Sequence, residues 1–402
     1  MHKISYYVDF PTQRPYDDLR IENVFGDPNH NMSLDYMLTH FHGFDTNSVY
    51  NSRWMDYRPD NELKFVLQFQ QMPGGVNVVL LPSTLERLRI DPNCYLLILN
   101  MLESRQDELA FSKHCKHKNI PLHKIIVLTS NKLSHRKTLH GINYVYVDFW
   151  ESLNRQHCRF LRDVRLLYPK DRHKTIASAN KHYISLNRNL KPHRIWWMYA
   201  LSQTGAEQHG HVSYHLPDVD AQHHSDLIEH DLVLRKIPEQ RRQEYLSNKT
   251  QALHARHLDT LAEHPVNHVI EIVEYYKDSL VSYVTESDTE YDFITEKTYK
   301  AIANCHPFFI VGNPDQHATL RSKGYYTFED LFEQDAITNL EQAEQACAWI
   351  NRTPIEQLRE RIAQDYMHKL EHNFWNYFDS INSWSTIVED ILFSVKKVQK
   401  TG

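Results

Sequence analysis

Short apolar segments, separated by longer polar stretches, recur along most of the chain. Runs of about four to eight β-branched, aromatic and other apolar residues between polar loops are typical of strands buried in a parallel sheet. Between several of these runs, apolar residues recur every third or fourth position, as they do in amphipathic helices. This alternation predicts an α/β fold with parallel sheets. The predicted strands cover residues 4–10, 64–70, 76–82, 94–101, 124–129, 142–147, 181–186, 211–216, 280–285 and 308–311.

The predicted strands form two groups, which suits the two domains of ordinary size that 402 residues allow. The first group ends near Trp150, and a basic amphipathic helix over 151–167 separates it from the second group, which begins at Lys181. We therefore predict two doubly wound domains followed by helices at the C-terminus. The predicted boundaries are 1–150 for the first domain, 151–180 for a linker helix, 181–371 for the second domain and 372–402 for the C-terminal helices.

Composition narrows the class of protein. Apolar residues make up 41% of the chain and aromatic residues 12%, which is enough for two cores and too much for a disordered protein. With only 10 glycines, the chain has no G-x-G-x-x-G and no G-K-[ST] phosphate loop. The five cysteines are scattered, which favours a reducing compartment. The N-terminal M-H-K leads into a predicted strand, and no apolar run reaches transmembrane length, so we expect a cytoplasmic protein without membrane insertion.

Charge is distributed unevenly. The net charge is −6, yet residues 105–194 contain 19 Lys/Arg against 6 Asp/Glu, which leaves 26 against 45 for the rest. Such asymmetry suggests a polyanionic partner, DNA among them, although part of the charge could serve a nucleotide or lie on a solvated surface. The nucleic-acid candidates in the predicted first domain are Lys113, Lys116, Lys118, Lys132, Arg136 and Lys137.

The most informative stretch follows the predicted strand 280–285. This strand ends at Glu286, and Thr295 stands where the N-cap of the next helix belongs, with Glu296 and Lys297 in the first turn. In a parallel sheet these residues fall at the carboxyl edge, where ligands bind. A lysine and a helix N-terminus suit a diphosphate, and a carboxylate can accept a ribose or sugar hydroxyl. The spacing alone leaves open that Glu296 only complements the helix dipole and that Lys297 is solvated.

A second set of candidates follows the predicted strand 181–186. Asn187 and Arg188 come directly after it, and a helix is predicted to begin at Pro192 with His193 and Arg194 in its first turn. Cations at a helix N-terminus oppose the helix dipole, so we expect an anion nearby. The alternative to anion binding is that the arginine is paired with surface carboxylates.

Two blocks of the first stretch resemble the donor-binding motif of the α-1,3-fucosyltransferase family. In that family F-E-N-S is followed at fixed spacing by D-Y-[IV]-T-E-K, and here T-E-S-D at 285–288 is followed by D-F-I-T-E-K at 292–297. Ser287 departs from the family asparagine. The H-P-F-F-I-V-G-N at 306–313 and the L-R-x-x-G-Y that follows are similar to sugar transferases of phages and large viruses. The resemblance covers about a third of the chain.

The resemblance implies a GT-B fold, in which two Rossmann-like domains face each other and a C-terminal helix packs back across them. It implies a GDP- or UDP-linked sugar donor, with cationic side chains instead of a metal meeting the diphosphate. The implied donor-binding residues are Asn187, Arg188, Arg194, Glu286, Ser287, Thr295, Glu296 and Lys297. The family also has a W-M-N-F-E-S-P-like block, which L-N-M-L-E-S-R at 99–105 resembles, so its catalytic base maps to Glu103.

These observations predict an inverting glycosyltransferase and leave its acceptor open. A hydroxymethylated pyrimidine in phage DNA is favoured by the basic region and by the phage-like motif variants. A glycan hydroxyl is the alternative, as in the family proper. A nucleotide- or nucleic-acid-binding protein that has lost the chemistry is a third reading. No metal site is expected at His114, Cys115 and His117, because a second ligand pair is missing and lysines surround them.

Overall fold

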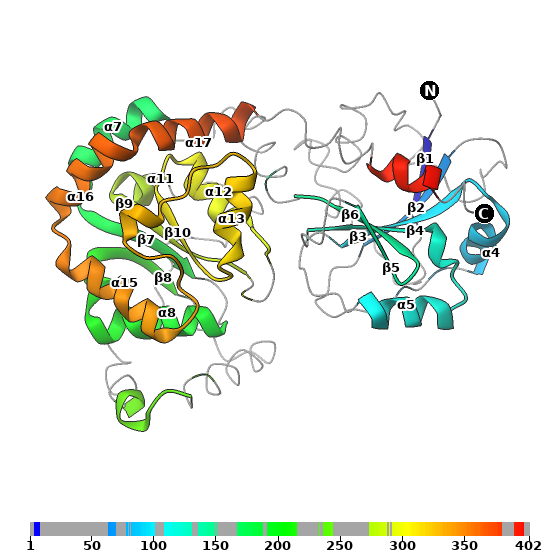
Figure 1. The fold of residues 1–402 in the computed structure, drawn as a ribbon, viewed down its shortest axis with the longest axis horizontal. Coiled ribbons are helices and arrows are strands. Elements are labelled where there is room, and N and C mark those ends of the chain that lie inside the picture. Colours follow the sequence, from blue (N-terminus) through cyan, green and yellow to red (C-terminus); the bar gives the residue numbers. More distant parts are fainter. Residues whose placement is uncertain are drawn as a thin grey trace, which may run out of the picture. The chain divides into compact units, whose positions relative to one another are not determined.

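The chain forms two compact units, Met1–Phe160 with Ile381–Gly402 and Leu161–Ser380 (Figure 1). The last segment of the chain thus returns to the first unit, while the expected packing of a C-terminal helix across both domains stays a prediction. The computed structural model describes residues 4–8, 63–69, 78, 80, 82–100, 108–130, 136–148, 151, 167–187, 191–214, 233, 236–243, 273–287, 289, 292–379 and 390–397.

The described strands of the first unit form one sheet in the order β1-β2-β3-β4-β6-β5. All neighbours pair in parallel except β5, which is antiparallel to β6. His140 and Gly141 connect these two strands with positive φ angles of 50° and 87°, as a tight hairpin requires. The strands are β1 (Ile4–Val8), β2 (Leu63–Phe69), β3 (Cys94–Asn100), β4 (Ile125–Thr129), β5 (Arg136–Leu139) and β6 (Ile142–Tyr146).

The predicted strand over 76–82 is wrong where the structure describes it. Val78 and Leu80 belong to no strand, and Pro82 begins a helix. Val78 is buried, and its main chain contacts His114 Nε2 at 3.2 Å, so at this position the chain lies against a helix instead of pairing in the sheet. The helices of this unit are α4 (Pro82–Ile90), α5 (Glu108–His117) and the 3₁₀ helix Leu122–Lys124.

Residues 390–397 are helical and belong to the first unit. Ile391 and Val395, one turn apart, are buried, and Lys397 Nζ donates to Thr138 Oγ1 at 3.1 Å. One apolar face therefore attaches this helix to the first unit.

The described strands of the second unit form a fully parallel sheet in the order β10-β9-β7-β8. Every residue of β9 is buried, which explains why its sequence is a near-continuous apolar run. The predictions over 181–186, 280–285 and 308–311 are confirmed. The strands are β7 (Lys181–Asn187), β8 (Gly210–Tyr214), β9 (Ser279–Thr285) and β10 (Phe308–Val311).

Helices cover both faces of this second sheet. α8 and α15 pack together on one face, and α7, α12 and α17 lie on the other (Figure 1). A π-helical turn, Ile362–Tyr366, joins α16 to α17. None of the helices in the described ranges is long and apolar enough to cross a membrane. The helices are α7 (Pro169–Ser178), α8 (Pro192–Thr204), α11 (Val273–Lys277), α12 (Glu296–Ala303), α13 (Asp315–Ser322), α14 (Glu329–Phe332), α15 (Leu340–Arg352), α16 (Ile355–Arg361) and α17 (Met367–Asp379).

The strand order of the second sheet creates a topological switch point. From β7 the chain passes to its neighbour β8, and β9 on the other side of β7 leads outward to β10. The connections after β7 and β9 therefore diverge, and a crevice outside the carboxyl ends of these two strands is where doubly wound sheets bind ligands. Thr285 Oγ1 donates to Asn187 Oδ1 at 2.7 Å and ties the two strand ends together.

Candidate functional site

Two helices begin beside the switch point. α8 starts at Pro192, after β7, and α12 starts at Glu296, after β9. Thr295 caps α12, because its Oγ1 accepts from the backbone N–H of Lys297 at 3.4 Å, and this confirms the predicted N-cap. The first turns of both helices bring backbone N–H groups and partial positive charge to the same edge of the sheet.

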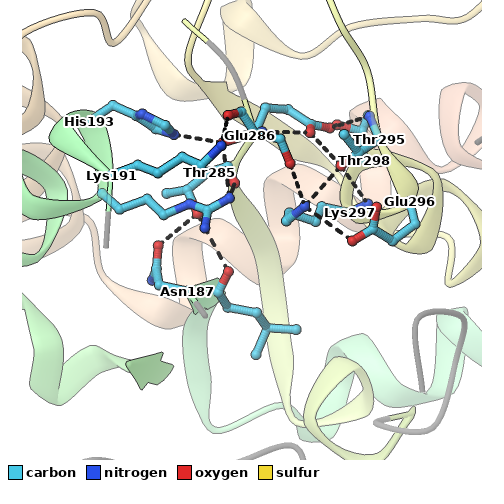
Figure 2. Close-up of polar contacts among 12 residues, drawn as sticks. Asn187, Lys191, His193, Thr285, Glu286, Thr295, Glu296, Lys297 and Thr298 are labelled. Carbon is cyan, nitrogen blue, oxygen red and sulfur yellow. Dashed lines mark hydrogen bonds and ion pairs between the residues drawn. The ribbon is translucent and has the colours of Figure 1, made fainter. Parts of the chain in front are cut away.

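Basic side chains at the start of α8 reach the end of β9 (Figure 2). Lys191 Nζ donates to the carbonyl oxygen of Ser287 at 2.6 Å. Arg194, which is buried, donates to the carbonyl oxygens of Thr285 at 3.3 Å and Glu286 at 3.2 Å. These contacts hold the turn after β9 against the N-terminus of α8.

His193 lies among these cations as a neutral imidazole. Burial lowers its pKa to about 3, and the neighbouring charge of Arg194 acts in the same direction. The carbonyl oxygen of Glu286 lies 2.6 Å from His193 Nε2, so the neutral ring carries its proton on that nitrogen and donates it. His193 therefore adds a hydrogen bond to this edge without adding charge.

Lys297 approaches the same turn from α12. Its Nζ donates to Ser287 Oγ at 3.0 Å, to Thr295 Oγ1 at 3.1 Å and to Glu296 Oε1 at 3.1 Å (Figure 2). Burial alone would raise the pKa of the Glu296 carboxyl, but the ammonium groups of Lys297 and Lys300 outweigh it and hold that pKa at about 2. Ser287 is thus contacted by Lys191 through its carbonyl oxygen and by Lys297 through its hydroxyl.

The Glu286 carboxylate faces the interior of this turn. Its Oε1 accepts from the Thr295 backbone N–H at 3.1 Å and from Thr298 Oγ1 at 2.6 Å. Its Oε2 accepts from the Ser287 backbone N–H at 3.2 Å and from Thr295 Oγ1 at 2.6 Å. Glu286 is 0% exposed and joins the end of β9 to the first turn of α12.

Most of the candidates named from the second domain gather at this edge of the second unit: Asn187, Arg194, Glu286, Ser287, Thr295, Glu296 and Lys297. The residues Glu103, Arg188 and Lys132 lie outside the described residues. Sequence reasoning missed the contributions of Lys191 and Thr298, and it wrongly counted His193 among the cations, because burial lowers its pKa to about 3 and keeps the ring neutral. A signal was present for the first of these, since Lys191 immediately precedes the proline that opens α8.

The described basic candidates of the first unit lie on its surface or on its edge strand. Lys113 and Lys116 are exposed on α5, Lys118 is exposed just after it, and Lys137 is exposed on β5, which begins at Arg136. On the opposite side of α5, Cys115 is buried, and burial raises its pKa to about 12. The described residues contain no group of three His, Cys, Asp or Glu side chains able to hold a metal ion.

No family model matches the chain. No curated protein sequence matches it either. Among solved structures, UDP-forming α,α-trehalose-phosphate synthase from Burkholderia vietnamiensis is similar with a TM-score of 0.41 and 11% identity, over 86% of this chain and 74% of that one. The Burkholderia multivorans α,α-trehalose 6-phosphate synthase gives 0.41 and 11%, over 86% and 72%. The trehalose-6-phosphate synthase OtsA gives 0.31 and 12%, over 85% and 67%. Similarity at this level identifies neither a family nor a substrate.

Proposed function

We propose that the chain is a glycosyltransferase of the GT-B type, which moves a sugar from a nucleotide-diphosphate donor to a hydroxyl acceptor. The observation that carries this proposal is the convergence of Lys191, Arg194 and Lys297 at the switch point of the second sheet, beside two helix N-termini. A diphosphate is the ligand whose charge and size complement such an edge. The resemblance of 285–297 to a donor-binding motif supports the same assignment.

Each side chain has a role suited to its chemistry. Lys297 and Arg194, with Arg188, would bind the diphosphate of a GDP- or UDP-linked sugar. Phosphate oxygens are stronger acceptors than the hydroxyl oxygens that Lys297 contacts in this structure, so the ammonium group has reason to turn to them. Glu296 stays ionised because its pKa is held at about 2, and it would accept a ribose or sugar hydroxyl.

The proposed reaction is a displacement with inversion at the anomeric carbon. Glu103 would take the proton of the acceptor hydroxyl as the acceptor oxygen bonds to that carbon. The bond from the anomeric carbon to the diphosphate breaks at the same time, and the nucleoside diphosphate leaves with the electron pair. Lys297 and Arg194 would stabilise the negative charge that develops on the leaving group.

The proposed acceptor is a hydroxymethylated pyrimidine in DNA. The exposed lysines on and beside α5, together with Lys137, favour it, because such a surface attracts the phosphate backbone. A glycan hydroxyl is the alternative that the fucosyltransferase-like motif favours.

The test is transfer of labelled sugar from UDP- and GDP-linked donors onto three acceptors: DNA containing hydroxymethylcytosine, unmodified DNA and simple glycans. Label on the hydroxymethylated DNA alone supports the proposal, and label on a glycan alone moves the enzyme to the alternative. Nucleotide binding without transfer to any acceptor would favour the non-catalytic binding protein. If neither UDP nor GDP binds in calorimetry, the donor site is assigned wrongly.

A further inference from the structure

The buried carboxylate of Glu286 has its accepting capacity in use. Two oxygens of a carboxylate offer about four lone-pair positions. In the described part of the chain four donors meet them, from Ser287, Thr295 (twice) and Thr298, at 2.6 to 3.2 Å. With the residue 0% exposed, a ribose or sugar hydroxyl would have to displace one of these donors to reach it. These bonds and this burial therefore argue against direct contact between Glu286 and the donor sugar.

The Thr295 hydroxyl links Glu286 to Lys297. A hydroxyl has one proton, and here it is donated to Glu286 Oε2 at 2.6 Å. The lone pairs of the same oxygen are left to accept from Lys297, from the backbone N–H at 3.4 Å and from Nζ at 3.1 Å. The carboxylate thus fixes which way the Thr295 hydroxyl points, and that direction presents an acceptor to the Lys297 ammonium.

Thr298 holds the carboxylate in place for this task. Its Oγ1 donates to Glu286 Oε1 at 2.6 Å from within the first turn of α12, and the Thr295 backbone N–H donates to the same oxygen at 3.1 Å. The Glu286 side chain therefore joins the end of strand β9 to the first turn of helix α12, the turn that carries Lys297.

We infer that Glu286 is a positioning residue, which orients Lys297 for the diphosphate through the Thr295 hydroxyl and is itself anchored by Thr298. The inference rests on the proposed function, because it assigns a partner to the lysine that is proposed to bind the donor. It differs from the role that the sequence motif implies for Glu286, which is contact with the donor itself.

A double-mutant cycle between Thr298 and Lys297 tests the inference. Thr298→Val removes the hydroxyl at nearly constant volume and should weaken the affinity for UDP or GDP about tenfold, the loss expected for a charge-assisted hydrogen bond that is no longer aligned. Thr298→Ser keeps the hydroxyl and should restore the affinity. In a Lys297→Met background, Thr298→Val should cause no further loss, because its effect passes through Lys297. Affinity is measured by isothermal titration calorimetry.

Controls separate positioning from a general loss of stability. Ser282→Ala also deletes a buried hydroxyl from β9, but that hydroxyl pairs with His306 Nδ1 at 2.8 Å, so this variant should lose stability and keep nucleotide affinity. Glu286→Gln places an amide NH₂ against the Thr donors and should reproduce the effect of Thr298→Val on affinity.

Three results would overturn the inference. Thr298→Val could weaken binding equally in both backgrounds, which would indicate a structural role. Thr298→Val and Glu286→Gln could keep full affinity while Lys297→Met loses it, which would leave the proposed function standing and remove Glu286 from it. Unchanged affinity in Lys297→Met itself would reject the donor-site assignment, and the inference would fall with it.

Discussion

The basic side chains beside the switch point contribute differently to the charge of this edge of the sheet. Arg194 and Lys191 bring charge to the end of β9, whereas His193 brings only an N–H donor, because burial lowers its pKa to about 3. The pH at which this edge of the sheet loses stability should therefore depend on His193.

We expect His193→Gln to flatten the dependence of stability on pH. In the unfolded chain a histidine takes up its proton near pH 6.5, but in the folded protein His193 does so only near pH 3. The contribution of the neutral His193 to the free energy of unfolding is therefore complete above pH 6.5 and decreases as the pH falls from 6.5 towards 3. The loss is about 1.4 kcal/mol per pH unit for such a residue. Glutamine can keep the donated bond to the Glu286 carbonyl without titrating.

Urea unfolding at pH 7 and pH 5 measures this difference. His173→Gln is the matched control, because it makes the same replacement at an exposed position on α7 of the same unit. The buried His306 and His182, whose pKa values are also lowered by burial, continue to contribute in every variant. An identical loss between pH 7 and pH 5 in wild type and His193→Gln would contradict the neutral assignment.

Lys297 and Arg194 are the two cationic side chains that we expect to matter most for nucleotide affinity. Lys297→Ala and Arg194→Ala should each weaken binding of UDP or GDP by about 1.5–3 kcal/mol, since each removes a charge-assisted hydrogen bond to the diphosphate. Calorimetry measures the affinity, with Lys174→Ala as the control, because this lysine is 81% exposed on α7. Unchanged nucleotide affinity in both site variants would reject the proposed donor site.

At the scale of elements, β8 is held close to β7 because Gly210 has no side chain. Gly210 pairs with Tyr183, and a Cβ on the glycine would overlap the tyrosine ring. The ring is 0% exposed, donates to the carbonyl oxygen of Ala206 at 3.2 Å and packs edge-on to Trp197 and Tyr283. It has little room to move.

Gly210→Ala should therefore destabilise the second unit by about 1–3 kcal/mol through overpacking. The backbone contributes no strain, since φ at this glycine is −130°. Thermal unfolding of the single variant and of Gly210→Ala combined with Tyr183→Val checks the cause, because the smaller side chain should relieve the overlap. Equal costs of Gly210→Ala with and without the tyrosine would show that the ring is not responsible.

The elements around the site could be predicted where their sequence carries a local signal. β10 is a continuous apolar run, β9 is a near-continuous one, and Thr295 stands before a helix, so both strands and the cap follow from spacing. The edge strand β5 could not be found, because R-K-T-L has no apolar run and is defined only by its pairing with β6. The apolar run over 76–82 was misleading, because Val78 is buried beside α5, and burial against a helix favours the same apolar residues as burial in a sheet.

The contacts within the site could not be predicted from the sequence, because they also depend on tertiary packing. His193 and the Glu286 carbonyl are 93 residues apart in sequence, and only the parallel pairing of β7 with β9 brings α8 to the end of β9. Nothing in the sequence distinguishes Thr298 from other residues of a first helical turn, because its hydrogen bond to the Glu286 carboxylate depends on the tertiary fold. The sequence motif names the residues of the site without distinguishing contact with a ligand from contact within the protein.

At the scale of the whole molecule, the basic stretch 105–194 is divided between the two units. Part of it is unavailable to a polyanion. Arg172 is buried and donates to the carbonyl oxygens of Tyr276, Ser279 and Leu280, Lys124 is buried in the first unit, and Arg194 belongs to the candidate donor site. The exposed described lysines of the stretch lie on and beside α5 and on β5 in the first unit, and on α7 in the second, and the DNA proposal uses those of the first unit.

Reversing the charge of the exposed lysines on and beside α5 tests whether they bind DNA. Each phosphate neutralised on DNA contributes a slope of about −0.9 to the dependence of log affinity on log salt concentration. Replacing Lys113, Lys116 and Lys118 with Glu should weaken DNA binding and make this slope shallower by up to about 3, while affinity for UDP or GDP is retained. These side chains are exposed, so the fold should tolerate the change.

Fluorescence anisotropy with a hydroxymethylcytosine duplex, at a series of salt concentrations, measures both the affinity and the slope. Reversal of Lys170 and Lys174, which are exposed on α7 of the second unit, lowers the net charge by 4, against 6 for the three reversals on and beside α5, and should have much less than two thirds of their effect. Losses in proportion to the charge removed would indicate that only net charge matters. If DNA binding is absent, or keeps the same slope after reversal on α5, the lysines there serve solubility and the glycan becomes the acceptor to test.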